Sequence, residues 1–532
     1  MRRTMSIVAA VVVAVSARAA NEPDLQMQTR IRQEGFRNSK VMELAAALTD
    51  LIGARLTGSP EMKRANEWTR DKLRELGLAN AHLEPFAFGR GWSYELCTVR
   101  MLTPDFEPLY GIPKAWSPGT NGPVRAKVAK VKLESKEDLD RNGGGKYAGM
   151  ILFTADAREM KLHETPQSER YSEAQLGEMS GYAIPGARDA ARSAEYTKRR
   201  AFRKALAEWA AAEKVLAIVD PGSGDEGTFT VQQSGSYKEG EPAGVTAVAL
   251  APEHYNRIVR LLEQNTPVEL ELNVATTFHD ADRNAYNTIA EIPGSDKRGE
   301  VVMLGAHLDS WHSGTGATDN AAGSAVVMEA ARILRAIGVT PKRTIRVALW
   351  AGEEQGLLGS RAYVAEHFGS RPEPSDPAER DLPLSMRKER PPLRIKPEHA
   401  KLAAYFNLDN GGGRIRGIYM QENAAVRPIF EPWLDAVRDL GATTLTMRNT
   451  TSTDHISFDE VGLPGFQFVQ DELEYLARSH HTNWDTYERL QREDLMQAAV
   501  VLATFVWESA NRPEMLPRKP WPVGEPKPVD VN

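Results

Sequence analysis

Two short apolar runs, Val301–Ala306 and Thr344–Trp350, each end directly on side chains that bind metal ions. The first run is followed by His307 and Asp309, and the second by an adjacent pair of glutamates. In open α/β sheets, functional sites form at the carboxyl ends of the strands. The pattern therefore predicts a metal-dependent hydrolase.

The ligand-type residues form a recognisable donor set. Five of them fall at predicted strand ends or in adjoining loops: His307, Asp319, Glu354, Asp409 and His481. Two imidazoles and three carboxylates suit Zn²⁺, with Mn²⁺ or Co²⁺ as possible substitutes. They are too many for one open catalytic zinc but suffice for two ions if one carboxylate bridges. We therefore expect a two-metal site.

The adjacent residues Glu353 and Glu354 can divide the chemistry. Neighbouring side chains on a turn point in different directions, so one can hold a metal while the other faces a water molecule. The metals would lower the pKa of that water, and the free carboxylate would take its proton and pass it to the leaving amine. Asp309 is predicted to support catalysis by orienting His307, and Asp454 to do the same for His481.

An α/β architecture must position these residues. From Asn287 onward, apolar strand-like runs alternate with helix-like segments, including expected helices over 320–337, 424–440 and 492–509. This alternation favours an α/β fold with a mostly parallel (mixed) sheet covered by helices on both faces. Upstream, a helix is expected over 39–56, and Ser59-Pro60 should start another.

The chain divides into five predicted parts. They are a signal peptide (1–20), the N-terminal part of the catalytic domain (21–107), an inserted β-rich domain (108–280), the catalytic domain (281–511) and a proline-rich, extended tail (512–532). The leader has paired arginines, an apolar run and small residues, which indicates a secreted or periplasmic protein. An N-terminal membrane anchor is the alternative. Within the catalytic domain, residues 369–396 are expected to form a surface excursion.

Composition excludes several classes of protein. A formal charge of −6 over 532 residues gives no basic footprint for nucleic acid. Cys97 is the single cysteine, which excludes an intramolecular disulfide framework and a cysteine-based zinc site. The H-E-x-x-H and G-x-S-x-G motifs do not occur, which argues against thermolysin-like and serine hydrolases.

Six motifs occur in order: GAHLDS, ATDNAAGSA, WAGEEQGLLGS, NLDN, STDHISF and HTNWDT. Together they resemble the co-catalytic (dinuclear) zinc exopeptidases, which include bacterial aminopeptidases, glutamate carboxypeptidase-like enzymes and plasma carboxypeptidase-like dipeptidases. The resemblance covers the mature chain. It implies that residues 108–280 correspond to the protease-associated insert of that family.

The resemblance also assigns roles. It implies that Asp319 bridges two zinc ions and that the peptide bond to Asn320 is cis. It assigns the remaining ligands as His307 and Asp409 to one ion, and Glu354 and His481 to the other. Glu353 would be the general base. Some relatives carry a tyrosine directly before the last histidine ligand; here that place holds His480, which could donate a hydrogen bond. His455 is a candidate for contacting either the substrate or a metal ligand.

The main functional hypothesis is a secreted exopeptidase of the aminopeptidase or dipeptidase type, because no arginine is evident that must hold a C-terminal carboxylate. A carboxypeptidase on the same site is the first alternative. A related amidohydrolase and a non-catalytic receptor with a peptidase-like fold are others. The expected partner is a peptide or dipeptide, with no nucleic acid and no stable membrane span after signal cleavage. Monomer and homodimer both remain open.

Overall fold

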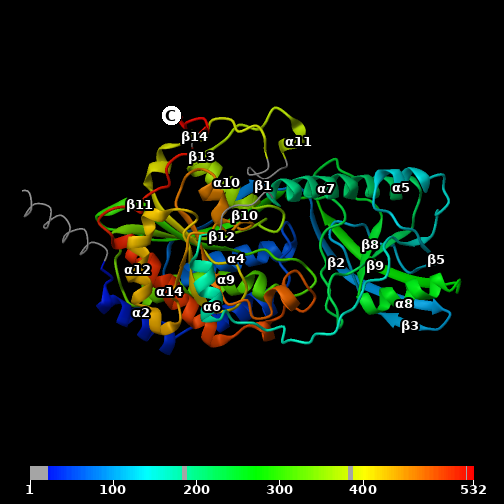
Figure 1. Ribbon diagram of the computed structural model, residues 1–532, viewed down its shortest axis with the longest axis horizontal. Helices are drawn as coiled ribbons and strands as arrows, with labels where there is room; N and C mark the ends of the chain where they lie inside the picture. Colours follow the sequence, from blue (N-terminus) through cyan, green and yellow to red (C-terminus); the bar gives the residue numbers. More distant parts are fainter. Residues whose placement is uncertain (1–21, 183–187, 381–386, 523, 532) are drawn as a thin grey trace, which may run out of the picture.

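The computed structural model describes residues 22–182, 188–380, 387–522 and 524–531. Within them lie two eight-stranded sheets and a small three-stranded one. Figure 1 separates the large sheets along the long axis, with the central sheet on the left and the second sheet on the right. The predicted signal peptide lies outside the described residues. Across the described part of the chain, no helix combines the length and apolarity needed to cross a membrane.

The central sheet carries the strands predicted to end at the site. In spatial order its strands are β1 (Ala79–Ala87), β10 (Asn284–Ile292), β12 (Arg343–Trp350), β11 (Lys297–His307), β15 (Leu402–Asn407), β18 (Gly465–Gln470), β16 (Ile415–Tyr419) and β17 (Thr444–Thr446). The middle of the sheet is parallel, because β11 pairs in parallel with β12 and β15, and β15 with β18. Antiparallel pairs join β1, β10 and β12, so the sheet is mixed.

Helices cover both faces of the central sheet. Alternate residues of β11 face opposite cores: Val302 and Leu304 pack into one, and Val301 and Met303 into the other. The first core includes α2 (Leu25–Arg37), α9 (Ala322–Ala336) and α14 (Arg492–Asn511), and the second includes α10 (Leu358–His367) and α13 (His455–Asp459). Burial on both faces explains why these strands are continuous apolar runs.

The N-terminal helices follow the expectation in part. α4 (Pro60–Glu75) begins where predicted, with the Ser59 hydroxyl accepting a hydrogen bond from the N–H of Met62 at 3.1 Å. The single helix expected over 39–56 is instead α3 (Val41–Ala46) followed by a π-helical segment that runs to Ile52. Gly53 ends this segment at φ +88°.

The second sheet gathers strands from a long stretch, residues 91–279, called here the second-sheet region. Its spatial order is β3 (Glu107–Leu109), β2 (Gly91–Thr103), β9 (Glu269–His279), β5 (Val124–Lys130), β6 (Ile151–Phe153), β7 (Ala217–Pro221), β8 (Thr246–Leu250) and β4 (Gly111–Pro113). The same region contains α7 (Arg188–Ala212) and α8 (Pro252–Glu263). The predicted insert, 108–280, leaves out β2, which pairs along its length with β9.

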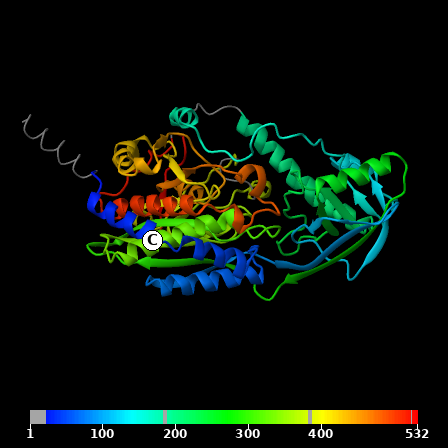
Figure 2. The same ribbon diagram turned by 90° about the horizontal axis from the view of Figure 1, so that it is seen from below.

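Part of the second-sheet region returns to the central sheet. We call residues 168–182 the strap. It contains α6 (Glu173–Ser180), which contacts β17, and Glu169 forms an antiparallel bridge with Leu473. Figures 1 and 2 both place α6 among the catalytic elements, far from the second sheet. The strap is therefore a further link between the two sheets, besides the chain crossings from β1 to β2 and from β9 to β10.

The excursion and the tail, expected as separate irregular segments, pair with each other. β13 (Gly369–Ser370) and β14 (Arg394–Ile395) are antiparallel, and β19 (Val529–Asp530) adds to β14 in parallel. Arg371 and Arg390 both form ion pairs with Glu525. The tail is therefore held against the catalytic domain.

Candidate metal centre

Three of the predicted site segments follow neighbouring parallel strands. β11 ends on His307, β15 ends two residues before Asp409, and the turn after β12 holds Glu353 and Glu354. Since the carboxyl ends of parallel strands meet at one edge, these side chains share that edge. Asp319 lies just before α9, where its peptide bond to the next residue is cis as predicted.

The carboxylate of Asp319 lies between two histidines. Its Oδ1 is 3.2 Å from Nε2 of His307, which is also 3.2 Å from Oδ1 of Asp409. Its Oδ2 is 3.2 Å from Nε2 of His481, and that nitrogen is 3.0 Å from Oε2 of Glu354. All five predicted ligands are therefore gathered around one carboxylate, with each of its oxygens facing a different imidazole.

His480 and His481 differ in their relation to this cluster. Nε2 of His480 is 3.9 Å from Oδ2 of Asp319, and no contact with Glu354 is found for it among the described residues. The two imidazole rings lie 3.7 Å apart between centroids. His480 is the more exposed of the two, with 39% of its side chain accessible against 19% for His481. His480 and His481 both lie within reach of Asp319, and His481 is the nearer and the less exposed of the two.

Asp309 holds the first strand end to the second. Its carboxylate accepts hydrogen bonds from the N–H groups of Glu353 at 3.2 Å and Glu354 at 3.3 Å, and from the hydroxyl of Thr57 at 2.8 Å. Nδ1 of His307 lies 3.0 Å from the main-chain carbonyl of Asp309 and 3.6 Å from its carboxylate. The nearer contact of His307 is thus the backbone carbonyl.

Asp485 fixes the backbone at Asp319 through hydrogen bonds. The sequence did not indicate this role. Its carboxylate accepts from the N–H of Thr318 at 2.7 Å, from the Thr318 hydroxyl at 2.7 Å and from the N–H of Asp319 at 3.0 Å. Burial raises the pKa of Asp485 to about 7. This residue lies within the HTNWDT motif. The motif was the only available signal for it.

Arg55 is a second support that the sequence did not reveal. The guanidinium is fully buried and donates to five main-chain carbonyls, those of Leu48, Gly53, Leu308, Thr315 and Gly316. Three of these carbonyls belong to the loop between His307 and Asp319. Burial lowers the pKa of Arg55 to about 10, and the nearby carboxylates oppose that shift. Arg55 therefore fixes the loop while placing a positive charge beside the acidic cluster.

Charge is tightly balanced within the site. Burial opposes protonation of His307 and His481, but the carboxylates around them outweigh it, raising the pKa of His481 to about 11 and that of His307 well above its usual value. Burial acts in the opposite sense on the glutamates, raising the pKa of Glu354 to about 7 and that of Glu353 well above its ordinary value. Carboxylates packed this closely call for positive charge among them.

The donor set fits divalent cations. Oε1 of Glu354 and Oδ2 of Asp319 are buried and accept no hydrogen bond. The ion-pair contact of Asp319 Oδ2 with His481 lacks hydrogen-bond geometry, so its short distance does not satisfy the oxygen. Buried carboxylate oxygens without donors are costly unless a cation contacts them. Imidazole and carboxylate together are the ligands that zinc accepts.

Asp454 lies on the other side of the site from the one expected. Its charge acts on His307 and Asp409, whereas Nδ1 of His481 lies 3.1 Å from the side-chain nitrogen of Gln232. The expectation that Asp454 orients His481 is therefore not met. Asp454 is fully buried, neither of its carboxylate oxygens has a hydrogen-bond donor, and burial raises its pKa to about 7.

Two aromatic side chains complete the surroundings. His455 is buried, its Nε2 lies 3.1 Å from the carbonyl of Thr450, and burial lowers its pKa to about 4. Tyr475 packs on His480 with ring centroids 4.9 Å apart. Burial and the surrounding carboxylates raise the pKa of Tyr475 well above its usual value. Tyr475 precedes His480 by five positions and so does not occupy the place directly before the last predicted ligand.

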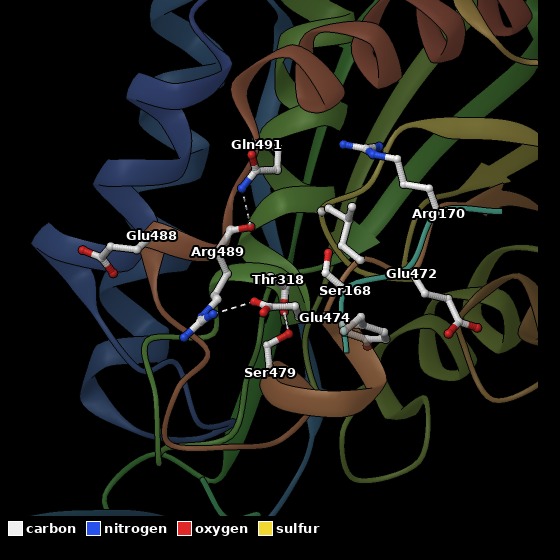
Figure 3. Close-up of a pocket in the computed structure, with 12 residues that line it drawn as sticks. Ser168, Arg170, Thr318, Glu472, Glu474, Ser479, Glu488, Arg489 and Gln491 are labelled. Carbon is white, nitrogen blue, oxygen red and sulfur yellow. Dashed lines mark hydrogen bonds and ion pairs between the residues drawn. The ribbon is translucent and has the colours of Figure 1, made fainter. Parts of the chain in front are cut away.

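A polar cavity of about 310 Å³ adjoins the cluster. Figure 3 shows Thr318 hydrogen-bonded to Ser479 at 2.7 Å, and Arg489 paired with Glu474, on its walls. None of the five predicted ligands lines it. The cavity reaches the site only through neighbours of the ligands, such as Thr318 and Tyr475.

A mixed α/β sheet with imidazoles and carboxylates clustered at its strand ends is the arrangement expected of a metal-dependent hydrolase. Residues 287–506 match the family described as Peptidase family M28. This match, together with the similarity to carboxypeptidases and aminopeptidases, indicates a metallo-exopeptidase.

Similarity to relatives extends over most of the chain. The chain is 27% identical to carboxypeptidase Q of Bos taurus over 485 residues, which cover 91% of this chain and 88% of that protein. The structure of a peptidase M28 precursor from Shewanella amazonensis superposes with a TM-score of 0.65 at 26% identity, covering 93% of this chain and 99% of the other. BSAP, a zinc aminopeptidase from Bacillus subtilis, has the same fold at a TM-score of 0.55 and 18% identity, covering 88% and 94%.

Proposed function

We propose that this protein is a secreted dinuclear zinc exopeptidase that removes terminal residues from peptides or splits dipeptides. The observation that carries the proposal is the position of Asp319, whose two oxygens face two different histidines at 3.2 Å each. A carboxylate placed in this way can bridge two cations. Secretion rests on the leader sequence over residues 1–20.

Two zinc ions would each take a histidine and a carboxylate besides Asp319. His307 and Asp409 would hold one, and Glu354 and His481 the other. The similar structure from Bacillus subtilis is described as that of a zinc aminopeptidase, which supports the choice of zinc. When bound, such ions polarise the scissile carbonyl and lower the pKa of a water molecule. Manganese or cobalt could substitute.

Glu353 would act as the general base. Its side chain is half-buried beside the ligands, and Asp309 fixes its backbone at 3.2 Å. Burial raises its pKa, which suits a group that takes a proton from the attacking water and returns it to the leaving amine. Asp309 accepts from the N–H groups of both Glu353 and Glu354 and so fixes the backbone of the pair.

Charge around the site favours a substrate with a free amino end. Asp454 and Glu353 lie near the ligands, and unpaired carboxylates attract an ammonium group. Two arginines near the site are engaged elsewhere: Arg55 donates to main-chain carbonyls, and Arg478 pairs with Glu226. An aminopeptidase or dipeptidase is therefore preferred. A carboxypeptidase is the alternative, and the similarity to bovine carboxypeptidase Q favours it.

The general-base assignment is tested by Glu353→Gln. The amide cannot accept the proton, so turnover should fall by roughly 10²–10⁴ while metal content stays near that of the wild type. Elemental analysis and turnover on the same preparation give both numbers. Glu366→Gln, at an exposed glutamate, is the control and should retain wild-type turnover. Wild-type turnover in Glu353→Gln would remove this residue from the role.

Substrate profiling separates the exopeptidase types. Aminoacyl substrates, N-blocked peptides and dipeptides should be compared on one preparation with its metal counted. Cleavage that requires a free amine supports the preferred assignment, and cleavage of N-blocked peptides supports the carboxypeptidase. Absence of bound metal together with absence of turnover would contradict the whole proposal.

A further inference from the structure

A segment of the second-sheet region is paired with the loop that carries His481. We call residues 229–232 the pairing segment. Two backbone hydrogen bonds join it to the loop, Val231 N–H to the His481 carbonyl at 3.2 Å and Asn483 N–H to the Phe229 carbonyl at 3.3 Å, and together they make an antiparallel bridge between Thr230 and Thr482. The side chain of Asn483 also accepts from the N–H of Phe229 at 2.8 Å. The two segments form a short ladder.

This ladder holds His481 in an uncommon conformation. The residue has φ +62°, in the left-handed region where residues with a side chain are rarely found. Its carbonyl accepts from Val231 at 3.2 Å and from the Ser313 hydroxyl at 3.4 Å. A left-handed backbone costs energy for a residue with a side chain, so it persists only where surrounding contacts hold it in place. The pairing segment supplies the shorter of these two contacts.

The same segment contacts the imidazole ring. The side-chain amide of Gln232 lies 3.1 Å from Nδ1 of His481, while Nε2 on the opposite side faces Glu354 at 3.0 Å and Asp319 at 3.2 Å. Rotation of the amide by half a turn exchanges its oxygen and nitrogen. When Nε2 binds a cation, the ring proton is on Nδ1, and the amide oxygen can accept it. A partner at the second nitrogen fixes the tautomer and the orientation of a ligand.

We propose that Gln232 is a positioning residue for His481, so that one of the two metal positions is completed by the second-sheet region. The inference rests on the proposed dinuclear site and adds to it a residue 249 positions away in the sequence. No contact of Gln232 with another predicted ligand is found among the described residues. Its influence should therefore fall on the position shared by His481 and Glu354 and leave the other unchanged.

The experiment compares three variants of the full chain. Gln232→Leu keeps the approximate size and removes both hydrogen-bonding groups, Gln232→Glu keeps an acceptor, and Gln233→Leu is the control. Gln232 is exposed, so replacing it should not disturb the core. Metal-free protein is titrated with Zn²⁺ against a chelating indicator, and with Co²⁺ while its visible spectrum is followed. Thermal unfolding of the metal-free variants checks that each is folded.

The expected result is selective. Gln232→Leu should weaken one of the two binding steps by about 10–100-fold and alter the corresponding cobalt spectrum. Gln232→Glu should restore the affinity, and Gln233→Leu should titrate like the wild type. Wild-type affinities for both ions in Gln232→Leu would overturn the proposal, as would failure of Gln232→Glu to restore the weakened step. Failure of the wild type to bind metal would instead overturn the proposed function.

Discussion

Glu508 is a buried carboxyl whose protonation affects stability. It is 7% exposed, and its Oε1 accepts from the N–H of Asp24 at 3.0 Å and from Gln28 at 3.3 Å. Burial raises its pKa to about 7. The folded pKa lies above the unfolded value of about 4.3. The stabilisation associated with the neutral form is therefore complete below about pH 4 and is lost as pH rises through 7.

Glu508→Gln should remove this loss, because the amide stays neutral and keeps an acceptor. Urea unfolding at pH 5 and pH 8 should show the variant gaining about 2 kcal/mol over the wild type between the two pH values. Glu493→Gln, at an exposed position of the same helix, should follow the wild type. A Glu508→Gln advantage that is equal at both pH values would contradict the assignment.

Single residues differ in how readily the sequence reveals them. His307 and Glu354 follow apolar strands directly, so their meeting could be predicted from the shared sheet edge. Arg55 and Gln232 act across 253 and 249 positions, through contacts that leave no local pattern. The motifs identify ligands, but the groups that hold them depend on tertiary packing.

At the scale of elements, α2 crosses α14 at a glycine. A Cβ added to Gly35 would lie 2.4 Å from Cγ2 of Val500 and 3.0 Å from Cδ1 of Ile333. Gly177, in α6, has no atom within 4 Å of the same added carbon. These two helical glycines therefore form a matched pair.

Gly35→Ala should lower the free energy of unfolding by about 1–3 kcal/mol, because the overlap forces the helices apart. Gly177→Ala should be neutral or add up to about 1 kcal/mol, the gain expected from helix propensity. Chemical unfolding of both variants measures the difference. Equal stability of the two would mean that the helix crossing adapts without strain.

Elements were predictable where burial is uniform. β12 is buried at seven of its eight residues and was recognised as an apolar run. β2 mixes buried, half-buried and exposed residues over 13 positions, because it pairs with β9 in a sheet whose surface is partly open. The π-helical segment over 47–52 has the same apolar spacing as an ordinary helix, so periodicity could not distinguish it.

At the scale of the whole molecule, the strap is fixed by Arg170. Its guanidinium pairs with Asp471 at 3.0 Å and with Asp494 at 2.8 Å. Both carboxylates are almost fully buried, at 0% and 2% side-chain exposure, and each keeps a second arginine, Arg416 or Arg414. Loss of Arg170 would therefore weaken the attachment without leaving either carboxylate alone.

Arg170→Gln should lower stability by about 1–3 kcal/mol, the range for hydrogen bonds to charged groups. It should also increase chymotryptic cleavage within the strap, after Tyr171 or Leu176, under native conditions. Arg199→Gln, which removes an exposed pair with Glu195 within α7, should stay within about 0.5 kcal/mol of the wild type. Unchanged proteolysis of Arg170→Gln would show that other contacts hold the strap.

β1, contributed by residues 79–87, is hydrogen-bonded to β10, and the span that matches the family begins within β10, at residue 287. Shortening the chain to residues 287–506 would strip this strand away together with Arg55. What remains of β10 would then be an edge strand with unpaired N–H and C=O groups. Such an edge can pair with a strand of another copy. We therefore expect the shortened chain to associate with itself instead of forming a working site.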